Sequence, residues 1–193
     1  MNPGYELRNT EGKGEGVVAC RDFQRGQLVM KGKIEKELET STSHSSQIGR
    51  NRHVLHAGLI STVNHSCNSN CGIRVNETGA HDFLAFRDIR AGEELTFDYA
   101  MRNYSVDHFP LRCMCGAPQC RGEITGWKSL PEEARKAYEG FVSPYLLEMD
   151  AGEPTNRQER DLSAAHGEPG ASSPRTLNSK PPPQVQCNRR PRP

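Results

Sequence analysis

Short apolar runs separated by polar turns dominate the first hundred residues of the chain. Several of these runs are short, rich in β-branched or aromatic residues, and alternate apolar with polar side chains, as β-strands do. The predicted strands are 17–20, 28–30, 73–75, 81–86 and 95–99, with a further short strand at 46–48 inside an otherwise polar surface connection, 35–50. The pattern therefore predicts a mainly β fold.

Only one segment has the features of a helix. Pro131 suits a first helical position, Glu132 and Glu133 suit the positive end of the helix dipole, and Gly140 suits a helix stop. We therefore predict one C-terminal helix over 131–139. The apolar residues that follow, between 141 and 147, are predicted to close the fold as an apolar clasp.

The composition changes after Asp150. Proline, serine, glycine and arginine dominate 151–193, and few large apolar residues remain to stabilise an ordered structure. This segment is predicted to be a disordered tail. The net charge is −2 up to Asp150 and +3 beyond it, and neither part is basic enough to indicate direct nucleic-acid binding.

The polar N-terminus has no secretory signal, and no apolar run approaches the roughly 20 residues that span a bilayer. We therefore expect an intracellular protein that does not enter a membrane, with the nucleus slightly favoured over the cytoplasm, and we expect a monomer.

Three cysteines lie close together in a C-x-C-x4-C pattern: Cys113, Cys115 and Cys120. Structural zinc is bound almost always by four tetrahedral ligands, so this pattern predicts a zinc site that needs one more ligand from elsewhere. From the residues alone, the fourth ligand is open among Cys20, Cys67, Cys71 and His108. Three cysteines packed in a small core are the alternative, but the segment has few apolar neighbours.

Two further motifs carry polar groups suited to a functional site. One is Asn64-His65-Ser66-Cys67, which places an amide, an imidazole and a thiol side by side, and the other is GEELTFDYA at 92–100. Asn and His can each donate and accept hydrogen bonds. Taken alone, the first motif is also typical of a polar turn with a buried cysteine.

In this order and spacing, the motifs resemble SET-domain protein lysine methyltransferases with a post-SET zinc segment. Gly14-Glu15-Gly16 matches the N-terminal G-x-G motif of that family, and the resemblance covers residues 11 to about 127. It implies several small β-sheets with a knot-like crossing. The implied organisation is a SET domain (1–110), a post-SET zinc segment (111–127), the helix and clasp (128–150) and the tail (151–193).

The resemblance also implies the cofactors and the site. S-adenosylmethionine would be bound by Gly14, Glu15, Gly16, Asn64, His65, Tyr99 and Trp127. Tyr99 would be catalytic, Phe97 would line the lysine channel, and zinc would be held by Cys67, Cys113, Cys115 and Cys120. The partner would be a protein lysine, a histone tail being one candidate. Two alternatives are a catalytically silent SET-type binding module and a plain zinc-stabilised interaction protein.

Overall fold

The computed structural model describes residues 3–10, 13–106 and 112–152. Within these ranges strands outnumber helices, which confirms the prediction of a mainly β fold. The ten strands are β1 (Tyr5–Thr10), β2 (Gly14–Ala19), β3 (Leu28–Met30), β4 (Ile34–Leu38), β5 (Ser46–Gly49), β6 (Arg52–His56), β7 (Asn64–His65), β8 (Cys71–Val75), β9 (His81–Ala85) and β10 (Glu94–Phe97).

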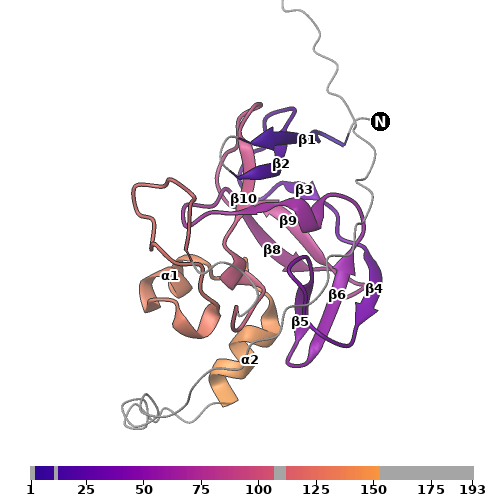
Figure 1. Cartoon of the computed structure of the whole chain (residues 1–193), viewed down its shortest axis with the longest axis vertical. Helices are drawn as coiled ribbons and strands as arrows, with labels where there is room; N and C mark the ends of the chain where they lie inside the picture. Colours follow the sequence, from indigo (N-terminus) through magenta and orange to yellow (C-terminus); the bar gives the residue numbers. More distant parts are fainter. Residues whose placement is uncertain (1–2, 11–12, 107–111, 153–193) are drawn as a thin grey trace, which may run out of the picture.

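Strand β10 is the central element of the larger sheet, whose order is β1-β2-β10-β8-β9-β3 (Figure 1). It runs antiparallel to β2 and parallel to both β7 and β8. Thr96 pairs with Asn64, and Phe97 pairs with both His65 and Cys71. The pairing therefore brings the two polar motifs of the sequence together on neighbouring strands.

The strands β4, β6 and β5 form a separate three-stranded sheet at the side of the molecule (Figure 1). The short strand predicted at 46–48 is present as β5. The rest of the predicted connection was only partly correct, because Ile34–Leu38 forms β4 and pairs with β6. This strand escaped prediction because its middle residues are all charged and exposed, so it lacks the alternation of a half-buried strand.

Strand β9 lies in the interior, and all five of its residues are buried. Phe83 packs edge-on against Phe97 of β10, with 4.9 Å between the ring centroids. His81 is also fully buried, and its Nε2 lies 2.9 Å from the hydroxyl of Ser143. A polar residue in a strand buried on both faces explains why a simple alternation rule describes β9 poorly.

The C-terminal part contains two helices, α1 (Glu132–Ala137) and α2 (Pro144–Gly152), instead of the single predicted one. Helix α1 is shorter than predicted, since Pro131 precedes it. The predicted clasp forms α2 because Pro144 opens a helix well and because Met149 lies one turn after Tyr145 and Leu146, so that all three are buried on one face. Helix α2 ends two residues into the predicted tail, and the remainder of that tail lies outside the described residues.

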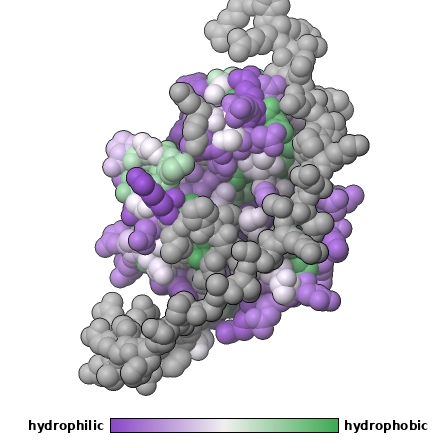
Figure 2. Space-filling model, in the orientation of Figure 1, coloured by the Kyte–Doolittle hydropathy of each residue, from purple (hydrophilic) through white to green (hydrophobic). Residues whose placement is uncertain are grey.

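Three short 3-10 turns complete the described structure: η1 (Ile60–Thr62), η2 (Tyr99–Met101) and η3 (Trp127–Ser129). On the face shown in Figure 2, hydrophilic residues cover most of the described surface and apolar residues form small patches. No helix in the described ranges is both long and apolar enough to cross a bilayer.

Candidate active site and cysteine centre

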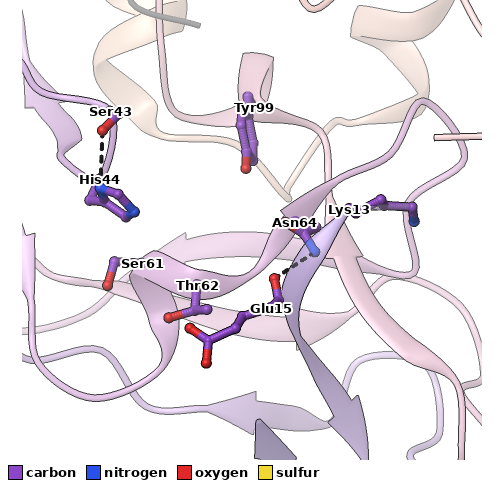
Figure 3. Close-up of a pocket in the computed structure, with 8 residues that line it drawn as sticks. All are labelled: Lys13, Glu15, Ser43, His44, Ser61, Thr62, Asn64 and Tyr99. Atoms are coloured by element: carbon purple, nitrogen blue, oxygen red, sulfur yellow. Dashed lines mark hydrogen bonds between the residues drawn. The ribbon is translucent and has the colours of Figure 1, made fainter. Parts of the chain in front are cut away.

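A cavity of about 360 Å³ opens where β2, β7 and the turns η1 and η2 meet. Figure 3 shows Tyr99 reaching into it, with Glu15 and Asn64 beneath and Ser43 and His44 on the opposite side. Its lining residues are Lys13, Glu15, Ser43, His44, Ser61, Thr62, Asn64 and Tyr99. The volume and the polar lining suit a small, polar organic ligand.

The glycine-flanked start of β2 forms one wall of this cavity. The side-chain amide of Asn64 donates hydrogen bonds to the carbonyl of Glu15 (3.1 Å) and to the carboxylate of Glu94 (2.8 Å). A Cβ atom on Gly16 would lie 2.8 Å from the Asn64 amide nitrogen, so any other residue here would displace that side chain. Gly14 has a φ of +76° and is exposed at the strand start.

Glu94 was not among the residues singled out in the sequence, yet it joins two walls of the cavity. One carboxylate oxygen accepts from Asn64 and the other accepts an ion-pair hydrogen bond from Lys13 at 2.7 Å. Glu94 lies near the start of the GEELTFDYA motif, and this position is the feature of the sequence that could have identified it. Lys13, Ser43, His44, Ser61 and Thr62 carried no such signal, because each lies in a turn or connection.

Tyr99 lies just past the end of β10, as the first residue of η2, and therefore does not continue the predicted strand 95–99. Asp98 causes the change, because its carboxylate accepts from the backbone N–H of Ala100 and caps the turn. The Tyr99 hydroxyl donates to the carbonyl of Val63 at 3.4 Å. Burial raises the pKa of Tyr99, so its hydroxyl keeps its proton near neutral pH.

The ring of Phe97 lies 5.0 Å from the ring of Tyr99, centroid to centroid. Phe97 is fully buried and does not line the cavity itself. Its position behind Tyr99 is consistent with the channel predicted from the sequence, and that role stays a prediction.

Of the predicted cofactor-binding residues, Glu15, Asn64 and Tyr99 line the cavity, whereas Gly14 and Gly16 flank Glu15 without lining it, and His65 and Trp127 lie in the interior. The Nδ1 atom of His65 accepts from the backbone N–H of Tyr99 at 3.3 Å, and its Nε2 lies 3.5 Å from the sulfur of Cys67. Burial lowers the pKa of His65 to about 4, so the ring is neutral. Trp127 is buried, and its Nε1 donates to Asp150 at 2.7 Å.

Four cysteines form a compact group that we call the cysteine centre: Cys67, Cys113, Cys115 and Cys120. Their sulfur atoms all lie within 4.8 Å of one another, and those of Cys67 and Cys113 are 3.8 Å apart. Tetrahedral zinc with Zn–S bonds of about 2.3 Å would place its sulfur ligands about 3.8 Å apart. The cysteine centre therefore fits a closed, four-thiolate zinc site.

The surroundings of the cysteine centre also suit thiolates. The backbone N–H groups of Arg121 and Gly122 donate to the sulfurs of Cys67 (3.5 Å) and Cys120 (3.4 Å). Among the other candidate ligands, Cys71 is fully buried in β8, and Cys20 does not join the group. His108 lies outside the described residues.

Asp98 connects the cysteine centre to the cavity and was missed in the sequence because its neighbour Tyr99 carried the motif. Its buried carboxylate accepts an ion-pair hydrogen bond from Arg121 at 2.7 Å and a hydrogen bond from the Tyr138 hydroxyl at 2.9 Å. Arg121 follows the last cysteine of the centre, and Asp98 precedes Tyr99. One ion pair therefore links the two sites.

Comparison with known proteins finds similar sequences and a similar fold. Residues 14–100 match the family model of the SET domain. An H3 lysine-36 specific histone-lysine N-methyltransferase of Mycosarcoma maydis is 30% identical over 63% of this chain and 14% of its own length. An H3 lysine-4 specific histone-lysine N-methyltransferase of Saccharomyces cerevisiae is 40% identical over 34% of this chain and 6% of its own length. The chain thus spans a small part of these relatives.

A crystal structure of KRYPTONITE in complex with mCHH DNA, an H3(1-15) peptide and SAH is similar in fold. The TM-score is 0.51 and the identity 25%, and the match covers 62% of this chain and 29% of that chain.

Proposed function

We propose that the protein transfers methyl groups from S-adenosylmethionine to lysine side chains of other proteins, because residues 14–100 match the family model of the SET domain. The observation that carries the proposal is the position of Tyr99. Its phenol enters a ligand-sized cavity whose facing wall is the glycine-flanked start of β2, held there by Asn64. The buried phenol could orient an amine, and the close-packed backbone wall could hold a small cofactor beside it.

The cavity supplies the contacts for the cofactor in this proposal. Glu15 and Asn64, which line the cavity, would lie along the cofactor, together with the backbone of the flanking Gly14 and Gly16. The carboxylate of Glu15 would offer an acceptor to the cofactor's amino or hydroxyl groups. His65 would act indirectly, since its ring fixes the backbone of Tyr99.

The contact between Trp127 and the adenine stays a prediction. Because the indole is buried, it would have to move to cover the adenine. Trp127 is the one tryptophan of the chain, so its fluorescence on addition of S-adenosylhomocysteine tests this contact directly.

When bound, the cofactor offers a sulfonium methyl that the lone pair of a neutral lysine amine takes, while the S–C electron pair returns to sulfur. The protein's task is alignment, which alone can lower such a barrier by several kcal/mol. The Tyr99 hydroxyl, with the Val63 carbonyl beside it, would orient the amine. Phe97 would form the apolar back of the lysine channel, where its ring already packs against Tyr99.

The cysteine centre would hold one zinc ion and fix the segment after residue 112 against the Asn64–Cys67 motif. Its role in this proposal is structural, because four protein ligands leave no open position for chemistry.

Histone lysines are the substrate class we propose first, because the curated relatives are histone-lysine methyltransferases of two different specificities. The choice of lysine is therefore not carried over to this chain. A histone substrate would place the protein in the nucleus.

The test is incubation of the purified protein with methyl-labelled S-adenosylmethionine and core histones, then with whole-cell protein. We expect label in lysine residues, with Tyr99→Phe strongly reduced. Binding of the cofactor without transfer to any protein would instead support a catalytically silent SET-type module, and no binding would overturn both.

A further inference from the structure

Arg102 is a buried cation that the functional site described above does not use. It follows η2, and only 2% of its surface is exposed. The guanidinium carbon lies 4.6 Å from the ring centroid of Phe97 and 5.7 Å from that of Tyr99. It therefore lies behind the two rings that we place at the lysine end of the cavity.

The charge of Arg102 has no counter-ion within the described part of the chain. None of the ion pairs among the described residues includes Arg102, and its Nε and Nη1 atoms are buried without a hydrogen-bond partner. Burial lowers the pKa of Arg102 to about 10, which still leaves the group charged at neutral pH. Since an uncompensated buried charge is costly, its retention needs a reason beyond packing.

The other groups around Arg102 do not cancel its charge. His56 and His81 are stacked on each other, and the pKa of each is lowered by burial first and also by the positive charge of Arg102. Both are therefore neutral at neutral pH. The hydroxyl of Tyr145 donates to the backbone carbonyl of Arg102 at 2.6 Å, so this hydrogen bond fixes the main chain and does not involve the guanidinium.

At the cavity itself, the ionisable groups are Lys13, Glu15, His44, Glu94 and Tyr99. Lys13 and Glu94 form an ion pair with each other. Glu15 and His44 are exposed, so water weakens their fields, whereas the buried charge of Arg102 is screened much less.

We propose that Arg102 is a positioning residue whose buried charge, behind Phe97 and Tyr99, keeps the bound lysine amine in its neutral, nucleophilic form. This inference rests on the proposed methyl transfer. A lysine ammonium that enters beside Tyr99 meets a fixed cation, and the repulsion favours release of its proton to solvent. The guanidinium lies 5.7 Å from the ring centroid of Tyr99 in buried surroundings, so we expect it to lower the pKa of an amine beside Tyr99 by on the order of one pH unit.

The same field acts on any cation at that end of the cavity, which allows a test without a protein substrate. S-adenosylmethionine carries a sulfonium charge and S-adenosylhomocysteine does not. Calorimetry would give the Kd of each for the wild type, Arg102→Met and Arg102→Lys. We expect the ratio of the S-adenosylmethionine Kd to the S-adenosylhomocysteine Kd to fall about tenfold in Arg102→Met and to stay within about twofold in Arg102→Lys.

Binding of S-adenosylhomocysteine shows whether each variant is folded, and Arg102→Gln replaces Arg102→Met if that variant does not fold. An unchanged ratio in a neutral variant that binds S-adenosylhomocysteine overturns the role of Arg102 and leaves the proposed function intact. A wild type that binds neither compound overturns the proposed function, and the inference with it.

The second readout is the pH dependence of kcat, which reports groups in the enzyme–substrate complex. With core histones as acceptor, the acidic limb should move up by about one pH unit in Arg102→Met and should not move in Arg102→Lys. The control Arg74→Met changes an exposed arginine on β8 and should match the wild type. In the wild type itself, a limb at or above the ordinary lysine pKa of about 10.4 would overturn the proposal without any variant.

Discussion

The carboxylate of Asp98 accepts a 2.7 Å ion pair from Arg121, which joins the residue before Tyr99 to the residue after Cys120. Asp98 is fully buried, and the Arg121 side chain is 19% exposed. The shape of the turn that presents Tyr99 therefore depends on a residue fixed by the cysteine centre.

Arg121→Met is expected to destabilise the fold by about 2–4 kcal/mol, because it leaves the Asp98 carboxylate buried with only neutral donors. Urea unfolding measures the loss, with Arg74→Met as the exposed-arginine control. Adding Asp98→Asn to Arg121→Met should recover part of the loss, since the uncompensated charge is then gone. Additive losses in the double variant would show that the two residues are not coupled.

The purified protein is expected to contain about one zinc per chain, as a closed four-cysteine site requires. Cys67→Ser should lose the metal because it removes one of the four clustered sulfurs. Cys71→Ala is the matched control, since Cys71 is a fully buried cysteine outside the cluster. Metal analysis after gel filtration decides the point, and full zinc in Cys67→Ser would remove that residue from the ligand set.

Tyr99→Phe is expected to lower the turnover about a hundredfold while the cofactor Kd stays close to that of the wild type. The reason is that the variant loses one hydroxyl aimed into the cavity and keeps the ring that packs on Phe97. Tyr5→Phe, a partly buried tyrosine on β1, is the control. Normal turnover by Tyr99→Phe would contradict the catalytic assignment.

Stability is expected to fall as the pH drops from about 6.5 to about 4. Burial, and then the charge of Arg102, lowers the pKa of His56 from 6.5 to about 4, so the unfolded chain binds a proton in this range that the folded protein does not. His81 shifts in the same direction. The His56 contribution is present above pH 6.5, amounts to at most about 3 kcal/mol, and is lost towards pH 4.

Urea unfolding at pH 7.5 and 5.0 measures this dependence. His56→Gln should show a smaller difference between the two pH values than the wild type, whereas His44→Gln, an exposed histidine, should show the same difference. Equal differences in all three proteins would assign the acid sensitivity to other groups, the cysteine centre first among them.

Gly72→Ala is expected to cost about 1–3 kcal/mol, because a Cβ there would lie 2.6 Å from the Cβ of Phe141. The neighbouring Ile73 amide also bonds to the Phe141 carbonyl, so the segment after α1 cannot simply move away. Gly49→Ala is the control, since its nearest new contact is 3.6 Å. Thermal unfolding compares the two, and equal midpoints would show that Phe141 yields easily.

Local patterns predicted the parts of this structure that depend on neighbours in sequence. Glycines and alternating apolar residues marked β2, β5 and β10, and the spacing of Cys113, Cys115 and Cys120 marked a metal centre. Features that depend on residues distant in the sequence could not be predicted. The charged strand β4 exists because β6 pairs with it. No motif in the sequence predicts that Arg102 is buried against the rings of Phe97 and Tyr99.

The residues of the site also divide into those that local motifs predicted and those that only the fold brings together. Asn64 and Tyr99 could be named from their motifs, whereas Lys13, Ser43 and His44 reach the cavity only because the chain folds them there. His65 and Trp127 show the converse, because a residue type suited to a ligand can instead be used to hold the interior together.

The pairing of β2 with β10 affects how the protein is made. On the ribosome, β2 emerges early with β1 as its hairpin partner, but its other edge stays open until β10 has been synthesised. Asn64 likewise lacks Glu94, and the cavity lacks Tyr99, until that same stretch appears. Open strand edges are sites of misassembly, so translation that stalls between 64 and 99 leaves a product for chaperones and proteases. The proposed methyl transfer can begin only after the chain has passed Tyr99.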